Sequence, residues 1–337
     1  MSVEKIRMAL GVLQSDPENE AAWNDLAEAV TAPDTSSDDV ERLLGLARAK
    51  QEQRREWGAV AKLLELEMSF ATGTPVEAPM QSELARIYQD ELIDVDKALA
   101  AYRRLLELQP DDETGNEAVE ADEAKRAKWS EIVDRYVAES ESADTPAFKS
   151  SLLVSAADVA FRYAREEARD RIAELLDLAL ALDPKNGRAA RLLEVSSGKS
   201  NDWDGVARAL TITLREGATK EDRIAAGLRL GRVASVKLDD QAKARDAYAQ
   251  VLDLQPGQAD ALSYLAELFS KGEQWDELVA LYEDQLKGGG VKPGDELGVL
   301  IQIAMVHWRM RSQPQAAEPY FDRVRRTDPT HAGMLSF

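Results

Sequence analysis

Few side chains in this sequence have types and spacings that could perform chemistry. The chain contains no cysteine, which excludes disulfides, thiolate nucleophiles and cysteine-based metal sites. Its two histidines, His307 and His331, form neither a paired-histidine metal motif nor part of a Gly-x-Ser-x-Gly nucleophile turn. The run 288–290 (Gly-Gly-Gly) lacks the Gly-Lys-Ser/Thr of a phosphate loop. We therefore expect no catalytic site, no metal site and no cofactor.

Carboxylates are plentiful, but their positions favour a structural role. Asp111-Asp112-Glu113 and Asp239-Asp240 stand where helices are expected to begin, and acidic residues there cap free amides and oppose the helix dipole. No feature of the sequence marks an acid/base pair. His307 occupies a position that holds Tyr88 and Tyr163 in sister segments, so we interpret it as a packed residue on a helix face.

The elements that would position any site come from an internal repeat. Trp57, Trp129, Trp203 and Trp275 are each followed, 53 to 55 residues later, by Pro110, Pro184, Pro256 and Pro329. Each of the first three prolines precedes the next tryptophan by 19 residues. Two rare residue types kept in step in this way indicate a repeated structural unit.

The clearest copies are 84–110 and 230–256, and they describe a helical hairpin. Ala98, Tyr102 and Leu105 share one face of the second helix at spacings of four and three. Ala85 and Ala98 are small, which allows close approach of the two helices, and Pro110 ends the second helix. Such a hairpin cannot bury both of its faces alone, so we expect it to stack on its neighbours.

These landmarks resemble the tetratricopeptide repeat (TPR), and the length and alternation resemble long bacterial TPR arrays. The residues that carry the resemblance are Leu84, Ala85, Tyr88, Ala98, Tyr102, Leu105 and Pro110, repeated at Leu230, Gly231, Ala244, Tyr248, Val251 and Pro256. The resemblance implies an all-α, right-handed α-solenoid of stacked antiparallel hairpins. The alternate hairpins diverge, with Glu120 and Glu194 where the family has a small residue.

The spacing predicts how the chain is divided. Residues 1–56 would form N-terminal capping helices, followed by repeat units at 57–110, 111–184, 185–256 and 257–329. Residues 330–337 parallel those after Pro256, so they would begin a further helix. We expect either a fragment of a longer repeat protein or a natural end with a short capping helix.

The charge and apolar content of the chain limit the classes of partner that it can bind. The formal net charge of −20 argues against a nucleic-acid backbone or an anionic membrane surface and permits a basic protein or peptide. No run of apolar residues is long enough to span a membrane, and the N-terminus lacks a secretory apolar core. We expect a cytoplasmic protein, and its alanine-, arginine- and aspartate-rich composition is typical of bacteria.

In the resembling family the first helix of each hairpin lines an inner groove, which implies candidate partner-binding residues. A second series, of lysines, stands 15 residues after each of the first three repeat prolines, although a lysine near a helix C-terminus is also favoured by the helix dipole. Together they predict a basic and apolar groove that selects an acidic or amphipathic segment. The candidates are Arg86, Gln89, Lys125, Phe161, Lys199, Arg232, Lys271, Met305 and Trp308.

Three functions remain open at this stage. A non-catalytic scaffold or adaptor that binds a protein or an extended peptide fits a chain devoted to stacked hairpins. Analogy with long bacterial arrays suggests polarity, motility or secretion assemblies, with a small Ras-like GTPase or a motility-machine component as partner. The alternatives are a regulatory TPR arm of a longer enzyme and an RNA-binding helical-repeat protein. The acidic charge argues against the latter.

Overall fold

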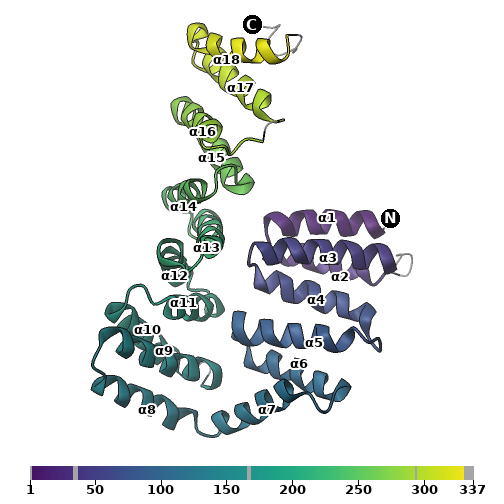
Figure 1. Ribbon diagram of the computed structural model, residues 1–337, viewed down its shortest axis with the longest axis vertical. Coiled ribbons are helices and arrows are strands. Elements are labelled where there is room, and N and C mark those ends of the chain that lie inside the picture. The colour runs from purple at the N-terminus through teal and green to yellow at the C-terminus, as the bar shows by residue number, and fades with distance from the viewer. Residues whose placement is uncertain (1, 33–36, 165–167, 293, 330–337) are drawn as a thin grey trace. The chain divides into compact units, whose positions relative to one another are not determined.

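The computed structural model describes residues 2–32, 37–164, 168–292 and 294–329, and all regular secondary structure within these ranges is helical. The expected all-α fold of consecutive helical hairpins is confirmed for these residues (Figure 1). Residues 330–337, for which a further helix was expected, lie outside the described ranges.

The chain divides into two compact units, residues 1–196 (unit 1) and 197–337 (unit 2). This boundary lies inside the third expected repeat, so compactness and sequence repetition divide the chain differently. The assignment of the repeat units stays a prediction.

Unit 1 is a stack of consecutive hairpins, and the helices at its start agree with the sequence pattern. Three helices, α1, α2 and α3, lie within residues 1–56, where capping helices were expected. The described elements of unit 1 are α1 (Ser2–Ser15), α2 (Glu20–Val30), α3 (Ser37–Gln53), α4 (Trp57–Ala71), α5 (Glu77–Arg86), the π-helical turn η1 (Ile87–Glu91), α6 (Val95–Leu108), α7 (Glu113–Arg126), α8 (Trp129–Ser142), α9 (Pro146–Tyr163), α10 (Arg169–Leu182) and α11 (Gly187–Lys199), which extends into unit 2.

Unit 2 repeats the same hairpin plan. Its further elements are α12 (Trp203–Glu216), α13 (Lys220–Arg232), η3 (Val233–Lys237), α14 (Gln241–Leu254), α15 (Ala259–Lys271), α16 (Trp275–Lys287), α17 (Glu296–Met305), η4 (Val306–Met310) and α18 (Pro314–Thr327). Helices α4, α8, α12 and α16 begin at the four repeat tryptophans. Trp57, Trp203 and Trp275 are partly buried and pack against buried apolar clusters.

A recurrent turn connects the two helices of each strong hairpin. In the first copy the helix widens to a π-turn at η1, and the amide of Asp94 donates to the Tyr88 carbonyl at 2.7 Å. Ile93 there has φ of 50°, and the equivalent Asp239 and Ser312 have 53° and 54°. Asp94 then caps α6 by accepting from the Lys97 amide. The chain therefore reverses within a few residues. The residues that follow η1, η3 and η4 have the same backbone conformation at the equivalent position.

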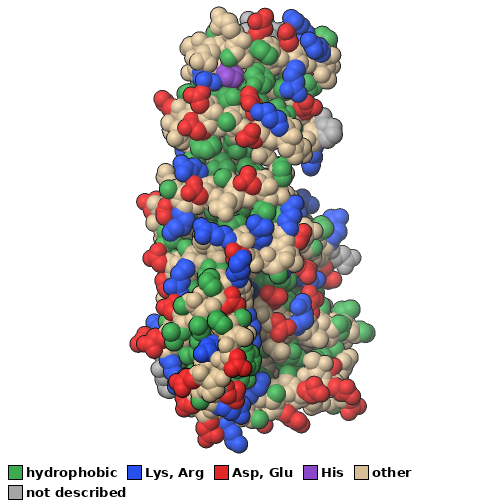
Figure 2. All heavy atoms as spheres, turned by 60° about the vertical axis from the view of Figure 1, so that its left-hand side comes forward, with side chains coloured by type: hydrophobic (Ala, Val, Ile, Leu, Met, Phe, Trp, Pro, Cys, Tyr) green, Lys and Arg blue, Asp and Glu red, His purple; other side chains and the backbone are tan. Residues whose placement is uncertain are grey.

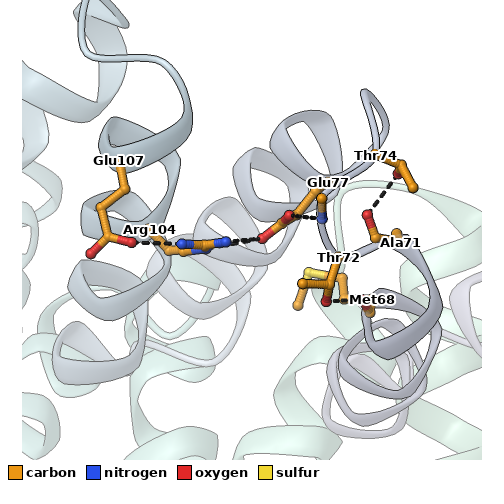
Figure 3. Close-up of polar contacts among 8 residues, drawn as sticks. Met68, Ala71, Thr72, Thr74, Glu77, Arg104 and Glu107 are labelled. Atoms are coloured by element: carbon orange, nitrogen blue, oxygen red, sulfur yellow. Dashed lines mark hydrogen bonds and ion pairs between the residues drawn. The ribbon is translucent and has the colours of Figure 1, made fainter.

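The joint between α4 and α5 in unit 1 is fixed by side chains (Figure 3). The Thr72 hydroxyl donates to the Met68 carbonyl at 3.1 Å, and the Thr74 hydroxyl donates to the Ala71 carbonyl at 2.6 Å. Both bonds close the last turn of α4, whose carbonyls have no helical partners. Within the described residues, no helix is both long enough and apolar enough to cross a membrane.

Candidate functional site

Helix α7 differs from its neighbours because one of its faces carries short side chains. Asp112 starts the helix by accepting a hydrogen bond from the Gly115 amide at 2.7 Å. Thr114, Ala118 and Ala121 then follow at spacings of four and three, which places them on one face. Only Gly115 and Asp122 of α7 are buried. A helix with so little apolar bulk fills little space against its neighbours, and its contact with α8 is slight.

A pocket of about 470 Å³ lies in front of this face, entirely within unit 1. Four elements supply its walls, and we call it the α7 pocket. The lining residues are Gln89 and Asp90 from η1, Val95, Ala98, Leu99 and Tyr102 from α6, Thr114, Glu117, Ala118, Ala121, Asp122 and Lys125 from α7, and Asp158, Val159, Arg162 and Tyr163 from α9.

Contacts across unit 1 fix the wall opposite α7. The Arg162 Nη1 donates to the Gln89 carbonyl at 3.3 Å, and its Nε lies 2.8 Å from the Asp158 carboxylate. Arg191 on α11 donates to the Glu91 carbonyl at 2.6 Å. These bonds connect α9 and α11 to η1. The wall opposite α7 is therefore held in place by residues that are distant from α7 in the sequence.

Asp122 places a carboxylate in the floor of the pocket. Its side chain is almost fully buried, and its Oδ2 accepts from Arg126 Nε at 3.3 Å. Its Oδ1 is buried with no hydrogen-bond partner among the described residues. Burial, then the charge of Asp122 and a hydrogen bond with its side chain, raise the pKa of Tyr163 to about 12, so this phenol stays neutral. Arg126 and Tyr163 therefore already supply a cation and a hydrogen-bond donor to this buried carboxylate.

The charge of the α7 pocket differs from the basic groove expected from the sequence, which stays a prediction. Asp90, Glu117, Asp122 and Asp158 face Lys125 and Arg162, so acidic side chains exceed basic ones in the lining. The sequence argument considered only positions on the first helices and the lysine series, and it omitted the carboxylates of α7 and α9. Figure 2 shows acidic and basic side chains interspersed on one face of the chain, with hydrophobic side chains between them.

Of the sequence candidates in unit 1, the structure brings two together. Gln89 and Lys125 both line the α7 pocket. Arg86 is exposed and Phe161 is partly buried, and neither belongs to the lining.

The remaining candidates lie in unit 2, and the lining of the α7 pocket does not include them. Lys271 is exposed and pairs with Glu267 at 2.5 Å, one turn earlier on its own helix, as expected of a solvated helix end. Met305 and Trp308 pack against the buried cluster of Ala304, Ala317 and Phe321, which favours a core role for both. Lys199 is exposed and Arg232 is partly buried.

His307 is a packed residue, as expected. It is 7% exposed, and its ring stacks on Tyr320 with centroids 5.7 Å apart. Burial, and then the charge of Arg311, lowers its pKa. Within the described residues, no group of three or more histidine and acidic side chains is arranged to hold a metal ion.

Sequence reasoning missed the residues that create the pocket. The signal was present at the position eight residues after each of the first three repeat prolines, which holds Ala118, then Leu192, then Tyr264. Only the first of these is too small to fill the space beside the preceding helix. The effect of a small residue at position 118 follows only from its place beside Tyr102, which the fold determines.

The chain was compared with protein families, curated proteins and solved structures. No protein-family model and no curated protein matches the chain. Similar solved structures include YrrB, described as a TPR protein with an unusual peptide-binding site, at 14% identity over 55% of this chain and 89% of YrrB, with a TM-score of 0.27.

Two further similar structures are PilF of Pseudomonas aeruginosa and the type IV pilus biogenesis factor PilW. PilF matches at 16% identity over 77% of this chain and 96% of its own, with a TM-score of 0.29. PilW matches at 16% identity over 78% of this chain and 99% of its own, with a TM-score of 0.28. Superpositions of this quality carry no argument about function, which must come from the site itself.

Proposed function

We propose that this chain is a non-catalytic scaffold or adaptor that binds an extended segment of another protein in the α7 pocket. The observation that carries the proposal is the pocket itself, bounded by η1, α6, α7 and α9 and lined by both apolar and charged side chains. A surface built from several helices of a stacked array suits an extended peptide, which contacts several repeats at once.

The charge of the pocket defines the kind of segment. Four carboxylates face two cations in the lining, and the whole chain has a formal net charge of −20. Complementary charge steers association and discriminates against partners of the same sign. The preferred partner is therefore a segment with lysine or arginine side chains, rather than the acidic segment that a basic groove would select.

Single-cysteine labelling tests where such a segment binds, because the chain has no native cysteine. Peptides selected from a displayed random library on the full chain would be titrated against a Thr114→Cys variant carrying an environment-sensitive dye. Asp260→Cys is the matched control, since Asp260 is exposed and stands at the equivalent position of unit 2. Peptides in the α7 pocket change the fluorescence at position 114 and leave position 260 unchanged.

Charge reversal at exposed wall residues supplies the second arm. Glu117→Lys weakens and Lys125→Glu strengthens the binding of a basic peptide, each by roughly two- to fivefold, because exposed charge pairs contribute about 0.2–1 kcal/mol. Lys271→Glu is the control and leaves affinity unchanged. Peptides that bind equally well in all three variants and leave the label at position 114 silent would move the binding surface elsewhere.

The wider assignment follows from the same proposal. A cytoplasmic adaptor in a bacterial polarity, motility or secretion assembly would present a basic segment of its partner to this pocket. A small Ras-like GTPase and a motility-machine component are the partner classes suggested by analogy with long bacterial arrays. Titration of such purified proteins against the labelled Thr114→Cys chain tests them directly.

A further inference from the structure

The chain contains its own example of an occupied pocket. In unit 2 the ring of Tyr264 on α15 lies over Tyr248 on α14, with centroids 4.5 Å apart. Burial raises the pKa of Tyr264, while a hydrogen bond with the Ser235 side chain opposes that shift. Tyr264 therefore inserts between the end of the first helix of the hairpin and the aromatic residue of its second helix.

The same place in unit 1 is the α7 pocket. Gln89 occupies the repeat position of Ser235, Tyr102 that of Tyr248, and Ala118 that of Tyr264. Gln89, Tyr102 and Ala118 all line the pocket. The side chain that fills the space in unit 2 is thus reduced to a methyl group in unit 1.

The first helices of the two hairpins differ in the matching way. A Cβ at Gly231 would lie only 2.5 Å from the Tyr248 ring, so the aromatic pair in unit 2 requires glycine there. The equivalent residue in unit 1 is Ala85, which is fully buried. The filled site therefore combines a glycine with an inserted tyrosine, and the open site combines two alanines.

From this correspondence we infer that the α7 pocket receives an aromatic side chain of a partner segment, in the place that Tyr264 takes in unit 2, with a lysine or arginine next to it in the segment. The aromatic ring packs against Tyr102 and Ala118, and a tyrosine hydroxyl lies within reach of Gln89. The neighbouring cation lies near the exposed carboxylates of Asp90 and Glu117 in the lining, while Asp122 keeps its own partner Arg126. The inference rests on the proposed function and adds its recognition rule.

Filling the pocket from within tests the rule. Ala118→Tyr with Ala85→Gly reproduces the combination found in unit 2 and avoids a clash between Ala85 and the displaced Tyr102 ring. Ala124→Tyr is the matched control, because Ala124 is an exposed residue of the same helix outside the pocket lining. Circular dichroism and melting temperature would establish that both variants fold.

A displayed library of random peptides of about 12 residues would be selected on the full unchanged chain and on both variants. We expect enrichment of peptides with one aromatic residue and an adjacent lysine or arginine. Their affinity falls at least about tenfold on the filled variant or when the aromatic residue becomes alanine, as for an interface anchor. The Ala124→Tyr control keeps full affinity.

The outcomes separate this inference from the proposed function. Peptides that change the fluorescence of the label at position 114 but lack an aromatic residue overturn the recognition rule and leave the scaffold proposal standing. Equal affinity on the filled variant, with the label still responding, also overturns it. If the library yields no peptide that changes the fluorescence at position 114, both the recognition rule and the proposed binding function are rejected.

Discussion

Arg104 on α6 contacts Glu77 at the start of α5, with Nη2 of Arg104 2.7 Å from Oε1 of Glu77 (Figure 3). Glu77 is almost fully buried, and its Oε2 accepts from the Gly73 amide at 2.6 Å. One carboxylate therefore joins the loop after α4 to the second helix of the hairpin. Arg104 also pairs with Glu107 at 2.7 Å, which helps to hold its guanidinium in place.

The first prediction concerns the pH dependence of this joint. The Gly73 amide, and then Arg104, lowers the pKa of Glu77. Because the unfolded pKa is about 4.3, the stabilisation is fully present above that pH and is lost as the pH falls through the lower folded pKa. Glu77→Gln should lower the melting temperature by a few degrees near neutral pH.

Thermal unfolding at about pH 7, 4 and 3 checks this prediction. The gap in melting temperature between the unchanged chain and Glu77→Gln should narrow as the pH falls. Glu107→Gln is the control, since Glu107 is exposed and its pair contributes little. A gap that stays constant across the range would show that protonation of Glu77 does not matter to the joint.

A second prediction concerns Ser150, which is fully buried and connects three helices. Its hydroxyl donates to the Ala179 carbonyl at 2.8 Å and accepts from Asn186 Nδ2 at 2.9 Å. Ser150→Ala leaves the Asn186 amide without this partner, and the loss should cost about 1–2 kcal/mol of unfolding free energy. The neighbouring Ser151→Ala, at an exposed position, should stay within about 0.5 kcal/mol of the unchanged chain in urea titrations.

A third prediction concerns the aromatic pair of unit 2. A Gly→Ala change inside a helix normally stabilises by about 1 kcal/mol. At Gly231 the contact with Tyr248 reverses the sign, and we expect Gly231→Ala to destabilise by about 1–3 kcal/mol through overpacking. When Tyr264→Ala is also present, Tyr248 has room to move away, and Gly231→Ala should become neutral or stabilising.

A double-mutant cycle measures this coupling. We expect an interaction energy of about 0.5–3 kcal/mol between positions 231 and 264, as for residues that share a packed contact. Ala226→Gly combined with Tyr264→Ala is the control, because Ala226 belongs to a different buried cluster from the two tyrosines. If the changes in unfolding free energy at positions 231 and 264 are additive, the glycine and the inserted tyrosine are not coupled. The filled variant of unit 1 would then not need the Ala85→Gly change.

Much of the fold could be predicted because it depends on local sequence. The repeat tryptophans mark the first residues of α4, α8, α12 and α16, and the prolines follow the ends of the second helices. Asp94 and Asp240 cap their helices as short acidic residues do at helix starts. These are effects of neighbouring residues, so a single sequence carries them.

The pocket could not be predicted in the same way, because its properties come from distant elements. Gln89 and Lys125 were expected to face a groove, but the carboxylates beside them include Asp158, which α9 brings from far along the chain. The left-handed conformation of Ile93 also has no local signal, since a β-branched residue disfavours positive φ. The surrounding turn imposes it, as the same geometry at Asp239 and Ser312 indicates.

A last prediction concerns His307, whose surroundings make unit 2 sensitive to acid. Arg311 Nη1 lies 3.1 Å from His307 Nδ1, and Tyr320 stacks on the ring while its hydroxyl donates to Glu283. Burial and Arg311 lower the pKa of His307 despite the opposing charges of Glu283 and Asp276.

The unfolded histidine binds its proton near pH 6.5, and the folded one binds it only at lower pH. Stability contributed by neutral His307 is therefore present above pH about 6.5 and falls as the pH drops toward the folded pKa, by at most about 1.4 kcal/mol per pH unit. His307→Phe keeps an aromatic ring against Tyr320 and should abolish this slope between about pH 7 and 5. Calorimetric unfolding over that range checks the slope, and an equal slope in the variant would place the acid sensitivity at other groups.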